Sequence, residues 1–188
     1  YKIKKNQYFF LLFRIYVMRV ERLENYVVQF KKGNFDLFDE FYEQVKRPCF
    51  YNIYSLIKNH DLSEDLLQET FVRFLKSVST LDENENVLGY LILISRNITL
   101  DYIKKHSRVR EFYEHEDVES RDENEIDKTI LLDKVSKILK KDQLEIFTLH
   151  VLSELTFEEI AKIMKRPLGT ILWSYNNSIK KLRKEIKL

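Results

Sequence analysis

Four carboxylates lie close together in one short stretch of the chain, at Asp61, Glu64, Asp65 and Glu69. Carboxylate oxygens are preferred ligands of Mg²⁺, so a metal-dependent nuclease site is one chemistry open to this group. The stretch offers no histidine or lysine placed for acid–base work, and the neighbouring Gln68 suits contact with a protein better. We therefore interpret the group as a protein-docking surface, with a merely solvated helix face as the plain alternative.

A second segment with binding potential is basic, since residues 162–187 include eight basic residues and one acidic residue. Just before it, the spacing of Thr156 and Glu159 predicts a capping box at the start of a short helix. The residue before a proline avoids the α region, so this helix ends at Arg166-Pro167 and a second begins near Leu168. The pattern predicts a helix-turn-helix, whose second helix lies in the major groove of DNA. An ordinary helical hairpin with a solvated basic face stays open as the alternative.

The helices that must position these residues can be predicted from the spacing of apolar side chains. One helix is predicted from Ser63 to about Ser77, with Asp61 or Ser63 as its N-cap. Its outer face carries Asp65, Gln68, Glu69 and Arg73, and its inner face carries Leu66, Leu67, Thr70, Phe71, Phe74 and Leu75. Further helices are predicted over Val87–Lys105, Ile130–Lys140 and Gln143–Leu152. The first of these leads into Lys104–Arg110, where four basic residues and no acidic residue favour phosphate contacts.

The composition favours an all-α protein. The 188 residues include three glycines and two prolines, too few for the turns of a sheet. The net charge is only +2, so any binding of nucleic acid depends on where the basic residues lie. Cys49 is the only cysteine, which predicts a core residue in a reducing, cytoplasmic compartment. We expect no enzyme, no catalytic residue, no metal and no cofactor, because a nucleophile–base set, a Gly-rich phosphate loop and zinc-ligand spacing are all missing.

An acidic stretch divides the chain. Residues 111–127 include nine acidic residues and one basic residue among few apolar ones, which predicts a flexible linker. The expected organisation is an N-terminal extension at 1–19, a helical domain at 20–107, the linker at 108–128 and a second helical domain at 129–188. The apolar run Tyr8–Phe13 is too short for a membrane span, and no secretory cleavage site follows it. Met18 offers an alternative start, which would make residues 1–17 an upstream extension.

Three segments of the chain carry motifs of a single protein family. The first is Leu155-Thr-Phe-Glu-Glu-Ile-Ala, with Pro167-Leu-Gly-Thr-Ile and Lys180-Lys-Leu-Arg. The second is Ser63-Glu-Asp-Leu-Leu-Gln-Glu-Thr-Phe, and the third is Leu91-Ile-Leu-Ile-Ser-Arg-Asn-Ile-Thr-Leu-Asp-Tyr-Ile-Lys-Lys. In this order they resemble region 4, region 2.2 and regions 2.3 and 2.4 of the extracytoplasmic-function (ECF) subfamily of bacterial RNA polymerase sigma factors. The segments follow the family's order and spacing over residues 23–184.

The resemblance implies a fold, a function and a set of site residues. The fold is two small helical domains, region 2 and region 4, on a tether. Contact of region 2 with the β′ clamp helices of core polymerase is implied for Asp65, Gln68, Glu69 and Arg73. Recognition of the promoter −10 element is implied for Tyr90, Arg96, Asn97, Asp101, Lys104, Lys105 and Arg108, and the loop Ser79–Asn86 would capture a flipped base. Region 4 would contact the β flap and read the −35 element through Thr156, Leu168, Thr170, Ser174, Asn177, Lys180, Lys181 and Arg183.

The chain departs from the family pattern at several positions. Tyr90 stands where a tryptophan is common, so a large aromatic side chain is kept. In the recognition helix, Leu172, Ser174, Asn177 and Ile179 stand where lysine or arginine is usual. Base reading is therefore expected to depend on Thr170, Ser174, Asn176 and Asn177. Trp173 replaces a small polar residue, and we expect it to pack in the core.

These expectations combine into promoter recognition by a dissociable polymerase subunit that also helps to open the DNA. The expected partners are core RNA polymerase, promoter DNA and an anti-sigma factor, and no small-molecule substrate. The protein would then associate with the nucleoid or be held at the membrane by the anti-sigma factor. A helix-turn-helix regulator that works without replacing sigma is the alternative, although it does not explain the acidic face or the Arg96–Arg108 segment. A purely protein-binding adaptor does not explain the basic helix-turn-helix.

Overall fold

The protein is built from helices. The computed structural model describes residues 23–82, 86–106 and 123–185, without the side chains of 123–127. No strand occurs within these ranges, and the expected all-α fold is confirmed there. The N-terminal extension expected at 1–19, most of the expected linker and Arg108 lie outside the described residues. The helices are α2 (Leu23–Lys31), α3 (Phe38–Ile57), α4 (His60–Ser77), α5 (Val87–His106), α6 (Glu123–Ser136), α7 (Lys141–Val151), α8 (Phe157–Met164) and α9 (Leu168–Glu185), with a 3₁₀ turn at Val78–Thr80.

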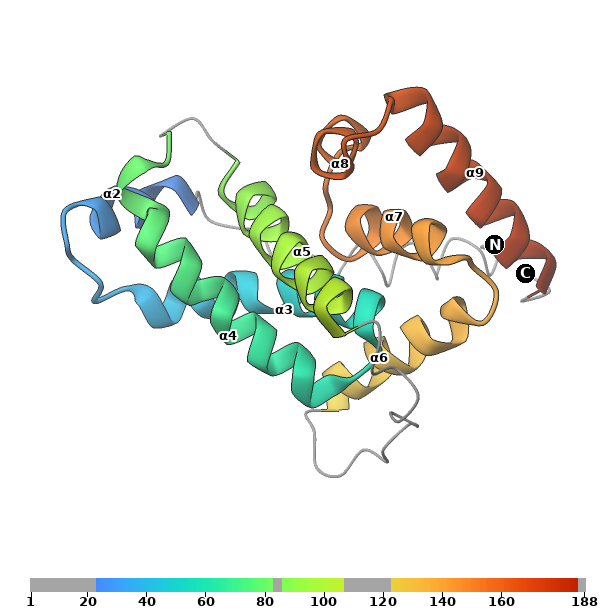
Figure 1. Ribbon diagram of the computed structural model, residues 1–188, viewed down its shortest axis with the longest axis horizontal. Helices are drawn as coiled ribbons and strands as arrows, with labels where there is room; N and C mark the ends of the chain where they lie inside the picture. Colours follow the sequence, from blue (N-terminus) through green and yellow to red (C-terminus); the bar gives the residue numbers. More distant parts are fainter. Residues whose placement is uncertain (1–22, 83–85, 107–122, 186–188) are drawn as a thin grey trace, which may run out of the picture.

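Helices α2–α5 form the first group (Figure 1). The central helix is α3, and α4 and α5 pack along it and against each other. Aromatic side chains fill the space between them: the Phe41 and Phe74 rings stack at 5.3 Å, and the Phe71 ring lies 4.7 Å from that of Tyr42. Such pairs contribute about 0.5–1.5 kcal/mol beyond the burial of their area. This packing fixes which side of α4 and of α5 faces the core, and therefore also which side of each helix is exposed.

Cys49 lies inside this group, on α3, with no exposed surface. Burial raises the pKa of its thiol, because an apolar environment disfavours the thiolate. The expected core role of Cys49 is confirmed.

Helices α6–α9 form the second group, in which α9 packs on α7 and α8. An aromatic cluster holds these three helices together: the His150 ring stacks on Phe157 at 4.1 Å and meets Tyr175 at 4.9 Å. The Nδ1 atom of His150 also lies 2.9 Å from the carbonyl oxygen of Leu155. Burial raises the pKa of the Tyr175 hydroxyl, and the nearby charge of Arg183 opposes that rise.

The predicted helix-turn-helix is present as α8 and α9. The Thr156 hydroxyl accepts a hydrogen bond from the Glu159 amide at 3.2 Å, and the Glu159 carboxylate accepts one from the Thr156 amide at 2.7 Å. This is the predicted capping box. The first helix ends at Met164, where Lys165 takes a left-handed φ of 53°, and α9 begins at Leu168 directly after Pro167.

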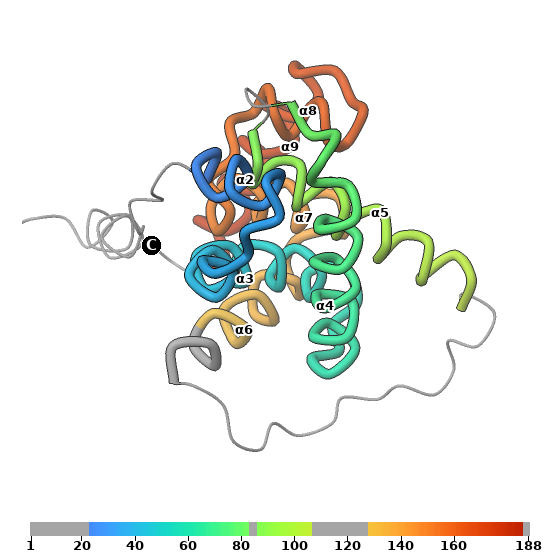
Figure 2. The backbone as a smooth tube through the Cα atoms, turned by 90° about the vertical axis from the view of Figure 1, so that its left-hand side faces the viewer, coloured from blue at the N-terminus to red at the C-terminus, as the bar shows by residue number. Residues whose placement is uncertain are grey.

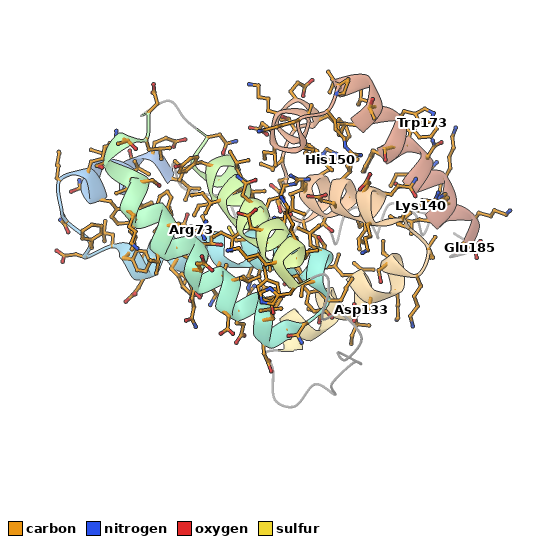
Figure 3. All side chains as sticks on the ribbon, viewed as in Figure 1. Arg73, Asp133, Lys140, His150, Trp173 and Glu185 are labelled. Carbon is orange, nitrogen blue, oxygen red and sulfur yellow. The ribbon has the colours of Figure 1, made fainter. Side chains whose placement is uncertain are left out.

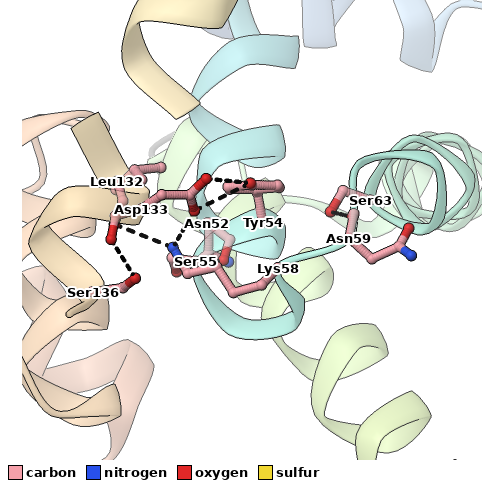
Figure 4. A network of polar contacts seen from close by, with 9 residues as sticks. All are labelled: Asn52, Tyr54, Ser55, Lys58, Asn59, Ser63, Leu132, Asp133 and Ser136. Carbon is pink, nitrogen blue, oxygen red and sulfur yellow. Dashed lines mark hydrogen bonds and ion pairs between the residues drawn. The ribbon is translucent and has the colours of Figure 1, made fainter. Parts of the chain in front are cut away.

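The two groups of helices pack against each other, mainly through α3 and α7 (Figures 1 and 2). Buried side chains of both groups belong to one hydrophobic cluster. A polar network adds to this contact (Figure 4): the Tyr54 hydroxyl donates to the Asp133 carboxylate at 3.1 Å, and Lys58 Nζ lies 3.3 Å from the same carboxylate. Burial lowers the pKa of the Lys58 amine, while the charge of Asp133 opposes that shift.

Two helix starts differ from the prediction. Helix α4 begins at His60, and its N-cap is Asn59, whose side-chain oxygen accepts from the Leu62 amide at 2.9 Å. The predicted caps were wrong, because the Ser63 side chain is buried and its hydroxyl donates back to the Asn59 carbonyl, and Asp61 lies within the first turn of the helix, after the N-cap. Helix α6 begins at Glu123 instead of Ile130, so residues 123–128 of the expected linker are helical.

Candidate nucleic-acid and protein interfaces

The outer face of α4 displays the four residues expected to dock on a protein. Asp65, Gln68 and Arg73 are exposed and Glu69 is half-buried, with the Glu69 carboxylate paired to the Arg73 guanidinium one turn later. Residues three, four and seven apart lie on one side of a helix. Val72 therefore falls on the same stripe, seven residues after Asp65, and half of its surface is exposed. Val72 thus adds an exposed apolar side chain to an otherwise polar stripe.

Val72 was missed by the sequence analysis. Its spacing from Asp65 and Gln68 is the signal that could have found it. Figure 3 labels Arg73 on α4, and its position one residue after Val72 places it at the edge of this stripe.

A histidine lies among the acidic residues of α4, contrary to the sequence analysis. His60 Nδ1 lies 3.6 Å from the carboxylate oxygens of both Asp61 and Glu64. The imidazole ring packs against Phe50 at 5.0 Å and only 11% of its side chain is exposed, which gives it a structural role at the start of α4. Among the described residues, no three His, Cys, Asp or Glu side chains are arranged to hold a metal ion.

The outer face of α5 separates the residues expected at the −10 element into two sets. Tyr90, Asn97, Asp101 and Lys104 follow each other at intervals of seven, four and three residues, so they share one side of the helix. The Asn97, Asp101, Lys104 and Lys105 side chains are exposed, while Tyr90 is half-buried with its ring 6.4 Å from Phe74. The structure thus brings five of the expected residues onto a common surface.

Arg96 does not lie with the others. It is turned about 100° away from Asn97 by the helical repeat, toward α7, where its Nε atom donates to a Glu145 carboxylate oxygen at 2.6 Å. This ion pair is largely buried, with side-chain exposures of 16% for Arg96 and 5% for Glu145. In this arrangement the Nε atom of Arg96 is bound within the protein, and the side chain points toward α7 instead of lying on the exposed face with Asn97.

The loop before α5 also touches the second group of helices. The Asn86 amide donates to the Glu159 carboxylate, the same group that caps α8. Asn86 Oδ1 accepts from the Gly89 amide at 2.8 Å and so caps the start of α5. Residues 83–85 of the loop that was expected to capture a flipped base lie outside the described residues.

Helix α9 has a buried and an exposed side. Ile171, Ser174, Ser178 and Leu182 form the buried side, and the Ser178 hydroxyl donates to the Ser174 carbonyl at 2.8 Å. Ser174 thus faces the protein core and not the outer surface. The expected readers Leu168 and Thr170 are exposed, and Asn177 is half-buried. Of the cations, Lys180 and Arg183 are exposed, and Lys181 donates to the Gln143 side chain at 2.9 Å.

The expectation that Trp173 packs in the core was wrong. Trp173 is 68% exposed and lies on the outer side of α9 (Figure 3). The reason is its position two residues after Ile171, which rotates it about 200° from the side of α9 that packs on α7 and α8. Its neighbour Tyr175 is the aromatic residue that packs inward, against His150 and Phe157.

The arrangement offers three exposed surfaces with different chemistry. The α4 stripe is mainly acidic and polar with one aliphatic side chain, which suits a basic protein surface. The last turn of α5 ends in Lys104, Lys105 and His106, and the last turn of α9 in Arg183 and Lys184, which suits phosphates. No helix in the described part of the chain is long and apolar enough to cross a membrane.

Residues 41–109 match the family model for sigma-70 region 2. The chain is 30% identical over 161 residues to the ECF RNA polymerase sigma factor BldN of Streptomyces coelicolor, a match that covers 80% of this chain and 60% of that protein. It is 26% identical over 179 residues to the ECF RNA polymerase sigma factor SigW of Bacillus subtilis, covering 86% and 95%. The chain thus spans 60% of the length of the first relative and nearly all of the second.

Two solved structures share the fold. The sigma factor RpoE of Bartonella quintana, in complex with the anti-sigma factor NepR, superposes with a TM-score of 0.68 at 23% identity, over 80% of this chain and 97% of that one. CnrH, in complex with the cytosolic domain of CnrY, superposes with a TM-score of 0.67 at 14% identity, over 89% and 98%. At these identities the superpositions show a common fold.

Proposed function

The chain belongs to the extracytoplasmic-function sigma factors, and on that basis we propose that it directs promoter-specific initiation as a dissociable subunit of RNA polymerase. The region 2 match over residues 41–109 carries this proposal, because it includes both the acidic stripe of α4 and the exposed face of α5. Catalysis in this view belongs to the core polymerase. A helix-turn-helix regulator that leaves sigma in place would require neither of these surfaces.

We propose that the surfaces divide the work. The α4 stripe, Asp65, Gln68, Glu69 and Arg73 with Val72, docks on the clamp helices of the β′ subunit. The α5 face reads and helps to open the −10 element, and α8 with α9 reads the −35 element while contacting the β flap. Opening DNA costs a few kcal/mol for each unstacked base. The cations at the end of α5 offset part of this cost by contacting the phosphates of the opened strands.

We further propose that an anti-sigma factor holds the protein out of action. Two relatives of the same fold, RpoE and CnrH, were solved in complex with NepR and with the cytosolic domain of CnrY. Such a partner would decide whether the protein is found with the polymerase on the nucleoid or at the membrane.

Complex formation with purified core polymerase tests the proposed function. The protein, labelled on surface lysine amines, should form a one-to-one complex with core polymerase. An unlabelled sigma factor of known activity should displace it competitively. A protein that binds promoter DNA alone and neither binds core nor competes would support the helix-turn-helix regulator instead.

The domain organisation is a proposal with its own test. We propose two units joined through the acidic segment. The first spans 20–107, and the second spans 129–188 together with the start of α6 from Glu123. Limited proteolysis with a Glu-specific protease is expected to cut first between Glu111 and Asp127, because that segment has few apolar side chains to protect it. Mass spectrometry of the first fragments decides the matter, and first cuts within 60–105 would show that the boundary is misplaced.

Two residues of α9 are expected to affect promoter choice differently. Replacing Asn177 by alanine removes an amide that can bond a base edge, so it should change the preferred −35 sequence at one position, with a loss of about 1–3 kcal/mol there. Replacing the exposed Lys180 by alanine should weaken binding to all sequences alike and lower the salt slope by about one. Both variants are compared as holoenzymes on a library randomised at −35. Equal, sequence-independent losses for the two variants would contradict this division.

A further inference from the structure

A stripe of four residues runs along the outermost side of α9. Gly169, Trp173, Asn176 and Lys180 are separated by four, three and four residues, which places them on one line opposite the buried Ile171 and Leu182. All four are exposed. This line is therefore the side of α9 that faces away from the protein core.

Trp173 dominates this stripe. With 68% of its surface exposed, it is the most exposed of the large apolar side chains in the described part of the chain, and Leu168 and Leu172 beside it are each 36% exposed. Several exposed apolar side chains close together on one helix indicate a binding surface. A tryptophan needed for packing would instead lie where Tyr175 does, against His150 and Phe157.

Gly169 leaves the helix open beside Trp173. A Cβ atom at residue 169 would have no neighbour within 4 Å, so packing within the protein does not require glycine there. Glycine inside a helix costs about 1 kcal/mol relative to alanine. Helical side chains lean toward the N-terminus, so the Trp173 indole leans toward the turn that contains Gly169. The bare backbone at residue 169 lets a partner approach the indole closely.

The charges along α9 indicate which partner this is. Residues 168–179 contain no charged side chain, whereas Lys180, Arg183 and Lys184 follow on the exposed surface. A helix in the major groove has this division, with its N-terminal part at base edges and cations beyond it on phosphates. At a base edge, an apolar side chain has one specific contact to make, with the C5-methyl group of thymine.

We propose that Trp173 is a specificity-determining residue that reads the methyl group of a thymine in the −35 element. The inference rests on the proposed function, since it places α9 in the major groove of promoter DNA. It assigns the apolar part of α9 to thymine and leaves sequence-independent affinity to the cations from Lys180 onward. Gly169 contributes by allowing the indole to approach the base edge.

Deoxyuridine provides a direct probe, because it differs from thymidine only by the missing C5-methyl group. The strongest promoter selected by the wild-type holoenzyme is resynthesised with each −35 thymine replaced in turn by deoxyuridine, and binding is measured by competition. One replacement should weaken the wild-type complex about fourfold, as expected for losing one buried methyl group. The Trp173→Ala holoenzyme should bind the thymidine and deoxyuridine promoters equally. The matched control, Lys180→Ala, should bind both more weakly and keep the fourfold difference.

Equal sensitivity to deoxyuridine in the wild type and Trp173→Ala would overturn the inference, and so would a wild type that is insensitive at every −35 thymine. A Trp173→Ala protein that loses affinity for core polymerase, with its promoter selectivity intact, would also overturn it and assign Trp173 to a protein contact. Circular dichroism should show unchanged helicity, because Trp173 is exposed. Failure of the proposed function is distinguishable, since a wild type without promoter-specific initiation yields no promoter on which to perform the comparison.

Discussion

Replacing Glu145 by glutamine is expected to destabilise the folded chain by about 3–5 kcal/mol. Glu145 is the counter-charge of Arg96 in a largely buried ion pair that joins α5 to α7. Removing the carboxylate leaves the Arg96 guanidinium largely buried without an opposite charge. An uncompensated buried charge is strongly destabilising. In a domain of this size the melting temperature should fall by about 10 °C. Thermal unfolding followed by circular dichroism measures the change.

Two further variants sharpen this test. Glu69→Gln breaks the exposed pair with Arg73 and is expected to cost less than about 1 kcal/mol, because solvent screens it. Arg96→Met combined with Glu145→Leu replaces the buried pair with apolar groups and should recover most of the lost stability. A Glu145→Gln protein as stable as the Glu69→Gln protein would contradict a structural role for the α5–α7 pair.

Reversing two charges on α4, Asp65→Lys together with Glu69→Lys, is expected to weaken binding to core polymerase about 100-fold while leaving helicity unchanged. Loss of one charged partner at a docked interface costs about 2–5 kcal/mol, and lysine adds repulsion toward a basic surface. Both side chains lie outside the aromatic core of α3 and α4, so the fold should tolerate the change. Competition for core polymerase measures the affinity.

A matched control is available on α3. Glu40→Lys with Glu43→Lys makes the same change in net charge on an exposed helix face and also breaks an ion pair, that of Glu43 with Lys46. Its affinity for core should stay within about twofold of the wild type, since surface charges away from the interface act mainly through weak, screened fields. Similar losses for the α3 and α4 variants would show that net charge, and not the α4 stripe, controls the binding.

Local signals in the sequence predicted the helices and the helix-turn-helix well. Thr156 and Glu159 form the predicted capping box, and Pro167 directly precedes the start of α9 at Leu168, although α8 already ends at Met164, before the left-handed Lys165. The inner face of α4 was also predictable, because Leu66, Thr70 and Phe74 recur with the helical period. Where Asn59, Asp61 and Ser63 compete as caps, local sequence does not select among them, and the burial of Ser63 decides.

What depends on tertiary packing could not be predicted in this way. The orientation of α9 is set by its contact with α7 and α8, so Trp173 and Ser174 lie on the opposite sides from those expected. The pairing of Arg96 with Glu145 joins residues 49 positions apart, on helices whose contact no periodicity reveals. Arg96 was expected on the surface with Asn97 because both belong to one motif, although neighbouring residues of a helix are rotated by about 100° from each other.

Run-off transcription with purified core polymerase on a genomic promoter library tests the central claim most directly. Addition of the protein as the sole sigma factor should give discrete transcripts, and their templates should share two short elements at a constant spacing upstream of the start. Core polymerase alone should give none of these transcripts. If the protein produces specific transcripts only when a second sigma factor is present, or binds DNA and starts none, it is a regulator and not a sigma factor.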